Sequence, residues 1–89
     1  MKKNWRFYLL RCCDNSLYSG ITNDLEKRIK KHNKGKGAKY TASHRPVRLE
    51  YFEKYSNKKD ASKREWQVKS WNKSKKECMI KGFSRQMIK

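Results

Sequence analysis

The sequence has no long apolar run and no cysteine spacing that is typical of a zinc site. Spanning a bilayer takes about 20 apolar residues, so we expect no membrane-spanning segment. Residues 1–5 lead into a strand-like pattern, so we expect no signal peptide. The cysteines, Cys12, Cys13 and Cys78, are odd in number and lack the spacing of a zinc site. We interpret them as small buried hydrophobic residues in a reducing cytoplasm.

Acidic residues are scarce. Eight Asp and Glu stand against 25 Lys and Arg, which gives a formal net charge of +17, and the basic residues run along the whole chain. A field of this sign favours a polyanion, and nucleic acid is the first candidate partner. A membrane surface would require an amphipathic helix with a broad apolar face, which the sequence does not show. A merely solvated lysine-rich surface is the alternative.

Aromatic residues are plentiful: the 89 residues include 3 Trp, 5 Tyr and 3 Phe. Each can bury a large area, so a few positions suffice for a compact core. A chain of this length forms one domain with a thin core. We expect this domain to cover residues 1–82 and to be followed by a loosely ordered tail at 83–89.

The hydrophobic pattern predicts an α/β fold with a small three-stranded antiparallel sheet flanked by helices. The first strand is apolar on both faces, which is typical of a central strand. Asn23 and Glu26 form a capping-box-like pair at the start of the first helix. The segment 34–46 is expected to be a basic loop followed by irregular chain. The expected elements are strands at 5–13 and 16–22, a helix at 23–33, a strand at 47–55, a helix at 58–72, and a short helix or turn at 73–82.

Two phenols, a guanidinium and an imidazole lie close together in the first part of the chain. Tyr8 and Tyr18 are on the two strands of the predicted hairpin, and Arg28 and His32 are one turn apart on the following helix. We expect Arg28 and His32 to lie half covered at the edge of the sheet. The group suits acid–base and phosphate chemistry, although a snorkelling arginine beside a surface histidine would have the same spacing.

Glu65 falls on the stripe of the helix at 58–72 that also carries Ala61 and Val68. Burying an unpaired carboxylate is costly, so the pattern predicts that Glu65 is neutralised, paired or bound to a metal. The alternative is a salt bridge to Arg64 or Lys69, or a helix rotated so that Glu65 is exposed.

In this order and spacing, these residues resemble the GIY-YIG nuclease superfamily. The segment Arg6–Tyr8 stands for its Gly-Ile-Tyr motif, and Tyr18–Gly20 stands for its Tyr-Ile-Gly motif. Arg28 matches the family arginine, His32 a histidine or tyrosine one turn later, and Glu65 the metal-binding glutamate. The resemblance covers about residues 5–82 and is closest to the short stand-alone bacterial members.

The resemblance implies a metal-dependent DNA endonuclease, structure-selective and linked to repair or recombination. Glu65 would hold one Mg²⁺ or Mn²⁺ ion, and Arg28 would bind the phosphate. It favours Tyr8 as general base, with Tyr18 orienting the phosphate. From the residues alone, Tyr8, Tyr18 and His32 all stay candidates for the base. The branched DNA substrate, an RNA substrate and association with the nucleoid are further expectations.

The remaining assignments concern Gly20 and the lysines. The resemblance implies that Gly20 leaves room beside the active-site tyrosine, and a β-bulge is the alternative. Lys69 is a candidate counterpart of an asparagine or lysine that completes the site in some members. A non-catalytic DNA- or RNA-binding module, or a ribosome-associated protein, would carry the same charge. The expected nucleic-acid-binding residues are Lys34, Lys36, Lys39, Lys58, Lys59, Lys63 and Lys69.

Overall fold

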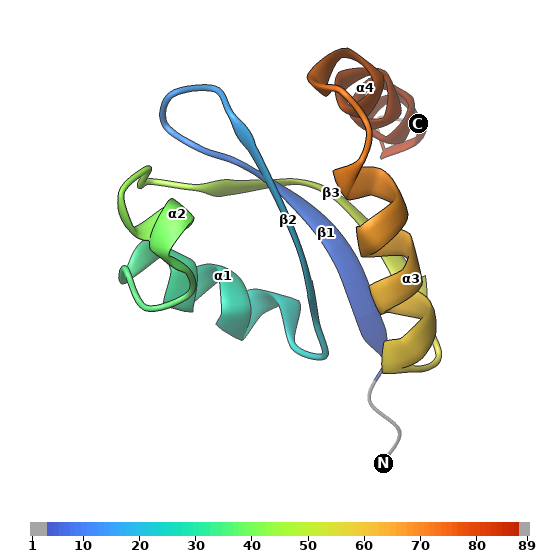
Figure 1. Ribbon diagram of the computed structural model, residues 1–89, viewed down its shortest axis with the longest axis horizontal. Coiled ribbons are helices and arrows are strands. Elements are labelled where there is room, and N and C mark those ends of the chain that lie inside the picture. Colours follow the sequence, from blue (N-terminus) through green and yellow to red (C-terminus); the bar gives the residue numbers. More distant parts are fainter. Residues whose placement is uncertain (1–3, 88–89) are drawn as a thin grey trace.

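The computed structural model describes residues 4–87, with side chains through Phe83. It contains a three-stranded antiparallel sheet with helices on both faces, as the α/β prediction requires (Figure 1). The strand order is β2-β1-β3. In chain order the elements are β1 (Trp5–Arg11), β2 (Leu17–Thr22), α1 (Leu25–Asn33), α2 (Lys39–Ala42), β3 (Arg48–Tyr55), α3 (Lys58–Lys69) and α4 (Lys73–Met87).

β1 is the central strand because it is apolar on both faces. Phe7 and Leu9 are fully buried on the face covered by α3 and α4, where they pack with Val68. Tyr8 and Leu10 are buried on the opposite face, which α1 covers (Figure 1). The alternation of a β-strand therefore turns Tyr8 towards α1.

The turn between β1 and β2 follows from its residue types. Asn15 has φ 73°, in the left-handed region that asparagine tolerates. The carboxylate of Asp14 accepts hydrogen bonds from the backbone N–H and the hydroxyl of Ser16. The resulting register places Tyr8 opposite Gly20 and Leu10 opposite Tyr18, so both phenols of the hairpin lie on one face.

Several helix boundaries differ from the sequence-based prediction. Asp24, and not Asn23, caps α1, because its side chain accepts the backbone N–H of Lys27. The segment expected to be irregular contains the short helix α2. α3 ends at Lys69, with Ser70 as its C-cap, three residues before the expected end at 72.

Part of the expected tail is helical. α4 continues to Met87, and Phe83 packs edge-on against Tyr51 at a ring-centroid distance of 5.0 Å. An aromatic contact of this kind anchors the second half of α4 to the core. The rest of the predicted tail, residues 88–89, lies outside the described residues.

The interpretation of the cysteines holds for one of the three. Cys12 is buried, but Cys13 and Cys78 are exposed, and all three thiols are free. The strand ends at Arg11, so Cys13 belongs to the turn and points away from the core. Within residues 4–87, none of the helices is long and apolar enough to cross a membrane.

Candidate active site

Tyr8 and His32 meet in the interior between β1 and α1. Tyr8 is 1% exposed and His32 is fully buried, and the Tyr8 hydroxyl lies 2.9 Å from His32 Nε2. The prediction that His32 is half covered is therefore wrong. The apolar stripe of α1 packs against the sheet, and His32, seven residues after Leu25, falls on the same side of the helix.

The hydrogen-bond partners of His32 fix its tautomer. His32 Nδ1 lies 2.7 Å from the hydroxyl of Thr41, and that hydroxyl donates its proton to the carbonyl oxygen of Ala38. With Thr41 donating to Ala38, we assign the imidazole proton to Nδ1 and the acceptor role to Nε2, which then receives the hydrogen bond of the Tyr8 hydroxyl. Tyr8, His32 and Thr41 thus form one buried chain of hydrogen bonds.

Burial favours the neutral form of both titrating groups, which lowers the pKa of His32 and raises the pKa of Tyr8. Burial, reinforced by the positive charge of Arg28, lowers the pKa of His32 to about 4. Burial raises the pKa of Tyr8 above its usual value of 10.0, and the nearby Arg28 guanidinium opposes that rise without reversing it. A preformed Tyr8 phenolate is thus disfavoured.

We expect the buried His32 to make stability fall as pH falls from about 6.5 to about 4. In that window the unfolded chain binds a proton at His32, with a pKa near 6.5, while the folded protein, with a pKa of about 4, does not. Stability is therefore greatest above pH 6.5 for this group. Urea unfolding across the window, with NMR titration of the imidazole, measures both quantities. A His32 signal that titrates near pH 6.5 would contradict the assignment.

Two glycines make room for this pair. A Cβ at Gly20 would lie 2.5 Å from the Tyr8 hydroxyl oxygen, and a Cβ at Gly37 would collide with His32 Nδ1. Gly20 lies in regular pairing with Tyr8, and the irregularity in the sheet falls between Leu9 and Leu10 instead. Close approach of the Tyr8 ring, and not a bulge at this position, therefore accounts for glycine at 20.

Arg28 presents an unused donor next to Tyr8. Its Nη2 donates to the carbonyl oxygen of Gly37 at 3.2 Å, whereas its buried Nε has no hydrogen-bond partner among the described residues. Buried donors are normally paired, so this N–H is free to donate to water or to a bound anion. Arg28 also lines a groove of about 160 Å³ with Lys27 and Lys31, which adds positive charge beside it.

Tyr18 forms the more exposed part of the site. Its ring is half-buried and lies edge-on to His32, with 5.3 Å between the ring centroids. Its other neighbour is Tyr40, which stacks on it at 6.1 Å and stacks in turn on His44 at 4.1 Å. The three rings Tyr18, Tyr40 and His44 thus form a ladder from the buried His32 to the surface.

Glu65 approaches the site from α3, on the other side of the sheet. Its side chain is 21% exposed and forms an ion pair with Lys69, with 3.5 Å between Nζ and Oε2. Burial is the main cause of the raised pKa of Tyr8, and the negative charge of Glu65 is a minor one. Lys69 lines a groove of about 320 Å³ with Tyr18 and Ser19, which point to opposite faces of β2. The groove therefore joins the two faces at the β2 edge.

The donor set at Glu65 fits one hydrated divalent ion. The described residues contain no group of three His, Cys, Asp or Glu side chains that could hold a metal. Mg²⁺ keeps several waters and binds through one or two carboxylates together with substrate phosphate oxygens, so a single glutamate suffices. The Lys69 partner is 59% exposed and lies 3.5 Å from Glu65 Oε2, so the ion pair is weakened by solvent and can give way to a divalent ion.

The predicted nucleic-acid-binding lysines are exposed and fall into two groups. One group lies just before α2 and at its first residue, which precedes Tyr40 of the ring ladder. The other lies on α3, which carries Glu65. The first comprises Lys34, Lys36 and Lys39, and the second comprises Lys58, Lys59, Lys63 and Lys69.

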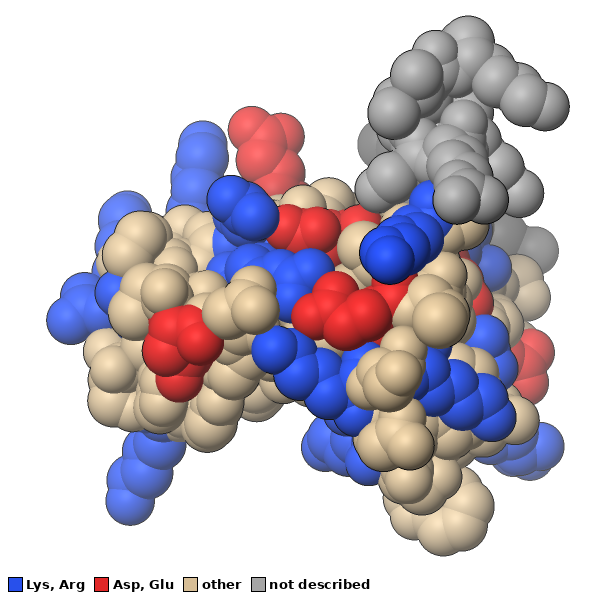
Figure 2. Space-filling model, turned by 90° about the horizontal axis from the view of Figure 1, so that it is seen from above, with Lys and Arg blue, Asp and Glu red and all other residues tan. Residues whose placement is uncertain are grey.

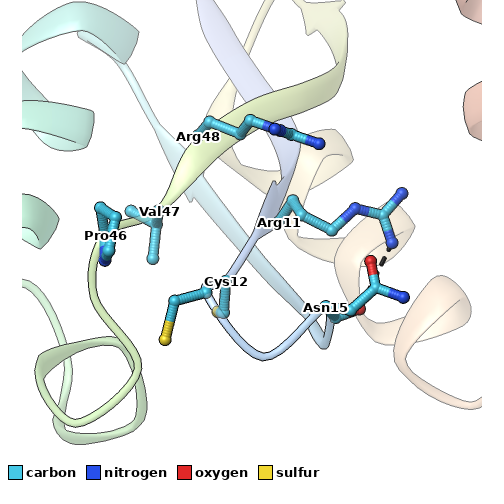
Figure 3. Close-up of a pocket in the computed structure, with 7 residues that line it drawn as sticks. Arg11, Cys12, Asn15, Pro46, Val47 and Arg48 are labelled. Carbon is cyan, nitrogen blue, oxygen red and sulfur yellow. Dashed lines mark hydrogen bonds between the residues drawn. The ribbon is translucent and has the colours of Figure 1, made fainter.

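A separate cavity of about 260 Å³ lies at the turn end of the sheet, lined by Arg11, Cys12, Asn15 and neighbouring residues (Figure 3). Arg11 is already paired there, with its Nη1 2.5 Å from the carboxylate of Glu77. Basic side chains elsewhere on the surface also have acidic neighbours: on the face shown in Figure 2, acidic side chains lie between the Lys and Arg side chains. A neutralised arginine has little capacity left for a phosphate, so this cavity is not the candidate site.

Comparison with known proteins decides the family. A family model described as the GIY-YIG catalytic domain matches residues 4–77. The chain belongs to the GIY-YIG family. The UPF0213 protein of Bacillus pumilus (strain SAFR-032) is 51% identical over 79 residues, covering 89% of this chain and 81% of that protein. The UPF0213 protein YazA of Bacillus subtilis (strain 168) is 51% identical over 77 residues, covering 86% and 78%.

Two solution NMR structures share this fold. The protein EF2693 from E. faecalis is 39% identical and has a TM-score of 0.63, covering 93% of this chain and 88% of that one. The UPF0213 protein BH0048 from Bacillus halodurans is 42% identical, with a TM-score of 0.57 and coverages of 88% and 83%. The chain is thus a short bacterial GIY-YIG protein. GIY-YIG is a nuclease family, which makes DNA the substrate class at a coarse level.

This GIY-YIG domain departs from the family motifs at packing positions. Arg6 and Phe7 replace Gly and Ile of the first motif, and Ser19 replaces Ile of the second. Phe7 is fully buried on the α3 side of the sheet, away from Tyr8. Ser19, 7% exposed, points to the same side. The substitutions leave both phenols of the GIY-YIG hairpin in place.

Sequence reasoning missed three residues of the GIY-YIG site: Gly37, Thr41 and Tyr40. Thr41 fixes the His32 tautomer, Gly37 admits the imidazole, and Tyr40 extends the ring ladder to His44. They come from a segment that the sequence predicts as irregular. The one available signal was the glycine spacing after the helix, at 35 and 37, which the prediction assigned to flexibility.

Proposed function

We propose that this protein is a divalent-metal-dependent endonuclease that hydrolyses DNA phosphodiester bonds. One observation carries the proposal. The buried hydroxyl of Tyr8 is hydrogen-bonded to Nε2 of the buried His32, beside Arg28, whose Nε has no hydrogen-bond partner among the described residues. This arrangement supplies a proton acceptor and an anion-binding group together. Those are two of the requirements for attack of water on a phosphodiester.

In the proposed reaction, Tyr8 removes a proton from the attacking water while its own proton passes to Nε2 of His32. The water oxygen bonds to phosphorus as the bond to the leaving 3′ oxygen breaks. Two arguments support the relay through His32. The tautomer leaves Nε2 free to accept, and burial makes an unrelayed Tyr8 phenolate unfavourable.

Arg28 and Tyr18 bind and orient the phosphate. A guanidinium donates two hydrogen bonds in a fixed fork that matches phosphate oxygens, and Arg28 has its Nε unpaired. Tyr8 is only 1% exposed, so the proposal requires the groups over its hydroxyl to move when DNA binds. Arg28 is restrained by a 3.2 Å hydrogen bond to Gly37, which is weak enough to be exchanged for a phosphate oxygen.

Glu65 would hold one Mg²⁺ or Mn²⁺ ion. Such an ion supplies Lewis-acid stabilisation of the phosphoryl and leaving oxygens. Glu65 is paired with Lys69, which lines the groove beside Tyr18, and the partly exposed pair can open when Lys69 binds phosphate. The two lysine groups would track the DNA backbone and give affinity without sequence readout.

The test is cleavage of plasmid, flap and junction DNA by the purified protein. We expect cleavage with Mg²⁺ or Mn²⁺ and complete loss of cleavage when EDTA removes the ion. A preparation made identically from cells with an empty expression plasmid controls for contaminating nucleases. Preference for flap or junction over plasmid would support a structure-selective role in repair or recombination.

A non-catalytic nucleic-acid-binding module is the second candidate, and the net charge of +17 favours it. That function predicts binding of all three DNAs with no product in either metal. If the protein binds DNA tightly but cuts none of the substrates, the endonuclease proposal is wrong and the binding function replaces it.

A further inference from the structure

Trp66 is the exposed large hydrophobic residue of α3. It is 80% exposed, whereas Trp5 and Trp71 are half-buried. Trp5 lies under the Lys58 ammonium at 5.5 Å, and Trp71 lies under both Arg64 and Lys75. Among the described residues, no such cation covers Trp66. Its ring faces are therefore open to a ligand.

The surroundings of Trp66 are positive on the same side of α3. Lys63 and Lys69 lie three residues before and after it, and Lys59 lies two turns before, so all three share its face of the helix. All three lysines are exposed. The acidic residues of α3, Asp60 and Glu65, are about 100–120° away around the helix axis. An apolar ring bordered by lysines and serines, with no acidic residue on its face, is complementary to a base with its phosphates.

Tyr40, the other large exposed aromatic residue, is not equivalent to Trp66. It is 41% exposed, but its ring stacks on both Tyr18 and His44. Its hydroxyl also donates to Ser16 at 2.6 Å, which holds the ring in place. A base that stacks on Tyr40 competes with these rings. Of these two exposed rings, Trp66 alone offers a free face for stacking.

Trp66 is also close to the candidate active site. It follows Glu65 directly in α3, and Lys69, on its face, reaches back to Glu65 at 3.5 Å and lines the groove beside Tyr18. A helix with its side chains is about 10–12 Å across, so the Trp66 ring and the Glu65 carboxylate lie within that distance. A DNA strand that leaves the groove along Lys69 therefore reaches Trp66.

We propose that Trp66 stacks on an unpaired nucleobase of the bound DNA, so that the protein selects DNA with a single-stranded segment next to the cleavage position. The inference rests on the proposed endonuclease function for its DNA substrate. Stacking needs a base outside a duplex, because a paired base has both faces covered by its neighbours. Trp66 thereby supplies the structure selectivity, and the lysines supply affinity for any DNA strand.

Binding to a fluorescein-labelled single strand and to its blunt duplex, both in EDTA, tests the inference without cleavage. Trp66→Ala is expected to weaken single-strand binding about tenfold and duplex binding less than about twofold. Trp66→Phe, which keeps an aromatic ring, retains most of the affinity. Lys63→Ala is the matched control, because loss of a phosphate contact weakens both DNAs alike and lowers the salt slope by about 1. Circular dichroism checks that each variant is folded.

Tryptophan fluorescence gives a second readout. The single strand should quench the wild-type signal, and that quenching should disappear in Trp66→Phe although Trp5 and Trp71 remain. Equal loss of affinity for both DNAs in Trp66→Ala, or no loss, would overturn the inference. So would sedimentation showing that Trp66→Ala turns a dimer into a monomer, which assigns the ring to an interface between copies. Because EDTA excludes turnover, absence of cleavage counts against the endonuclease alone and leaves these binding outcomes unaffected.

Discussion

Glu65→Gln is expected to reduce DNA cleavage about a thousandfold and to leave DNA binding almost unchanged. The amide has the size of the carboxylate but no charge, so it binds a hard divalent cation weakly. Losing several kcal/mol of transition-state stabilisation from the ion corresponds to that factor. Rates on a flap substrate, measured at saturating protein with a range of Mn²⁺ concentrations, give the effect.

The fold should survive this substitution. Glu65 is partly exposed, and its Lys69 partner is an i,i+4 surface pair, a type worth about 0.3–0.5 kcal/mol. Glu26→Gln is the matched control, because it makes the same change of charge on α1 at a carboxylate that is 85% exposed and paired with Lys30. It should cut at the wild-type rate. Equal cleavage by Glu65→Gln and the wild type would show that Glu65 holds no essential ion.

The sheet could be predicted from local chemistry. Asp14 and Asn15 mark the hairpin turn, and the apolar residues on both faces of the first strand mark it as central. These signals are contained in a few adjacent residues, so tertiary context does not change them. The helix ends were less predictable. Asp24 caps α1 and Ser70 ends α3. Neighbouring residues have a similar propensity to take these cap positions, so the sequence does not single out one of them.

The candidate site was predictable in its members but not in its proton chemistry. Tyr8, Arg28 and His32 could be named from spacing and resemblance. The tautomer of His32 depends on Thr41, which lies nine residues further along the chain and whose position requires the α2 turn. Burial of His32 likewise depends on Gly37, because any Cβ there would exclude the imidazole. Such contacts arise from the packing of α2 on α1, for which the sequence pattern gives no periodic signal.

Tyr8→Phe is expected to lower cleavage by about 10²–10⁴-fold while the protein stays folded. The substitution removes the proposed proton acceptor for the attacking water and retains the ring that fills the space over Gly20. It also leaves His32 Nε2 buried without its 2.9 Å donor, which costs about 1–3 kcal/mol of stability. Single-turnover rates and thermal unfolding of the same samples separate the two effects.

Tyr51→Phe is the control that tests whether lost stability alone explains lost cleavage. Tyr51 is also a buried phenol, 9% exposed, but it lies on the α3 side of the sheet and donates to Glu53. Its loss should lower the melting temperature by a similar amount, about 4–8 °C for each kcal/mol in a domain of this size. Cleavage by Tyr51→Phe should nevertheless match the wild type, because no proposed step uses its hydroxyl. If both variants lose cleavage equally, Tyr8 acts through stability and the proton relay to His32 is wrong.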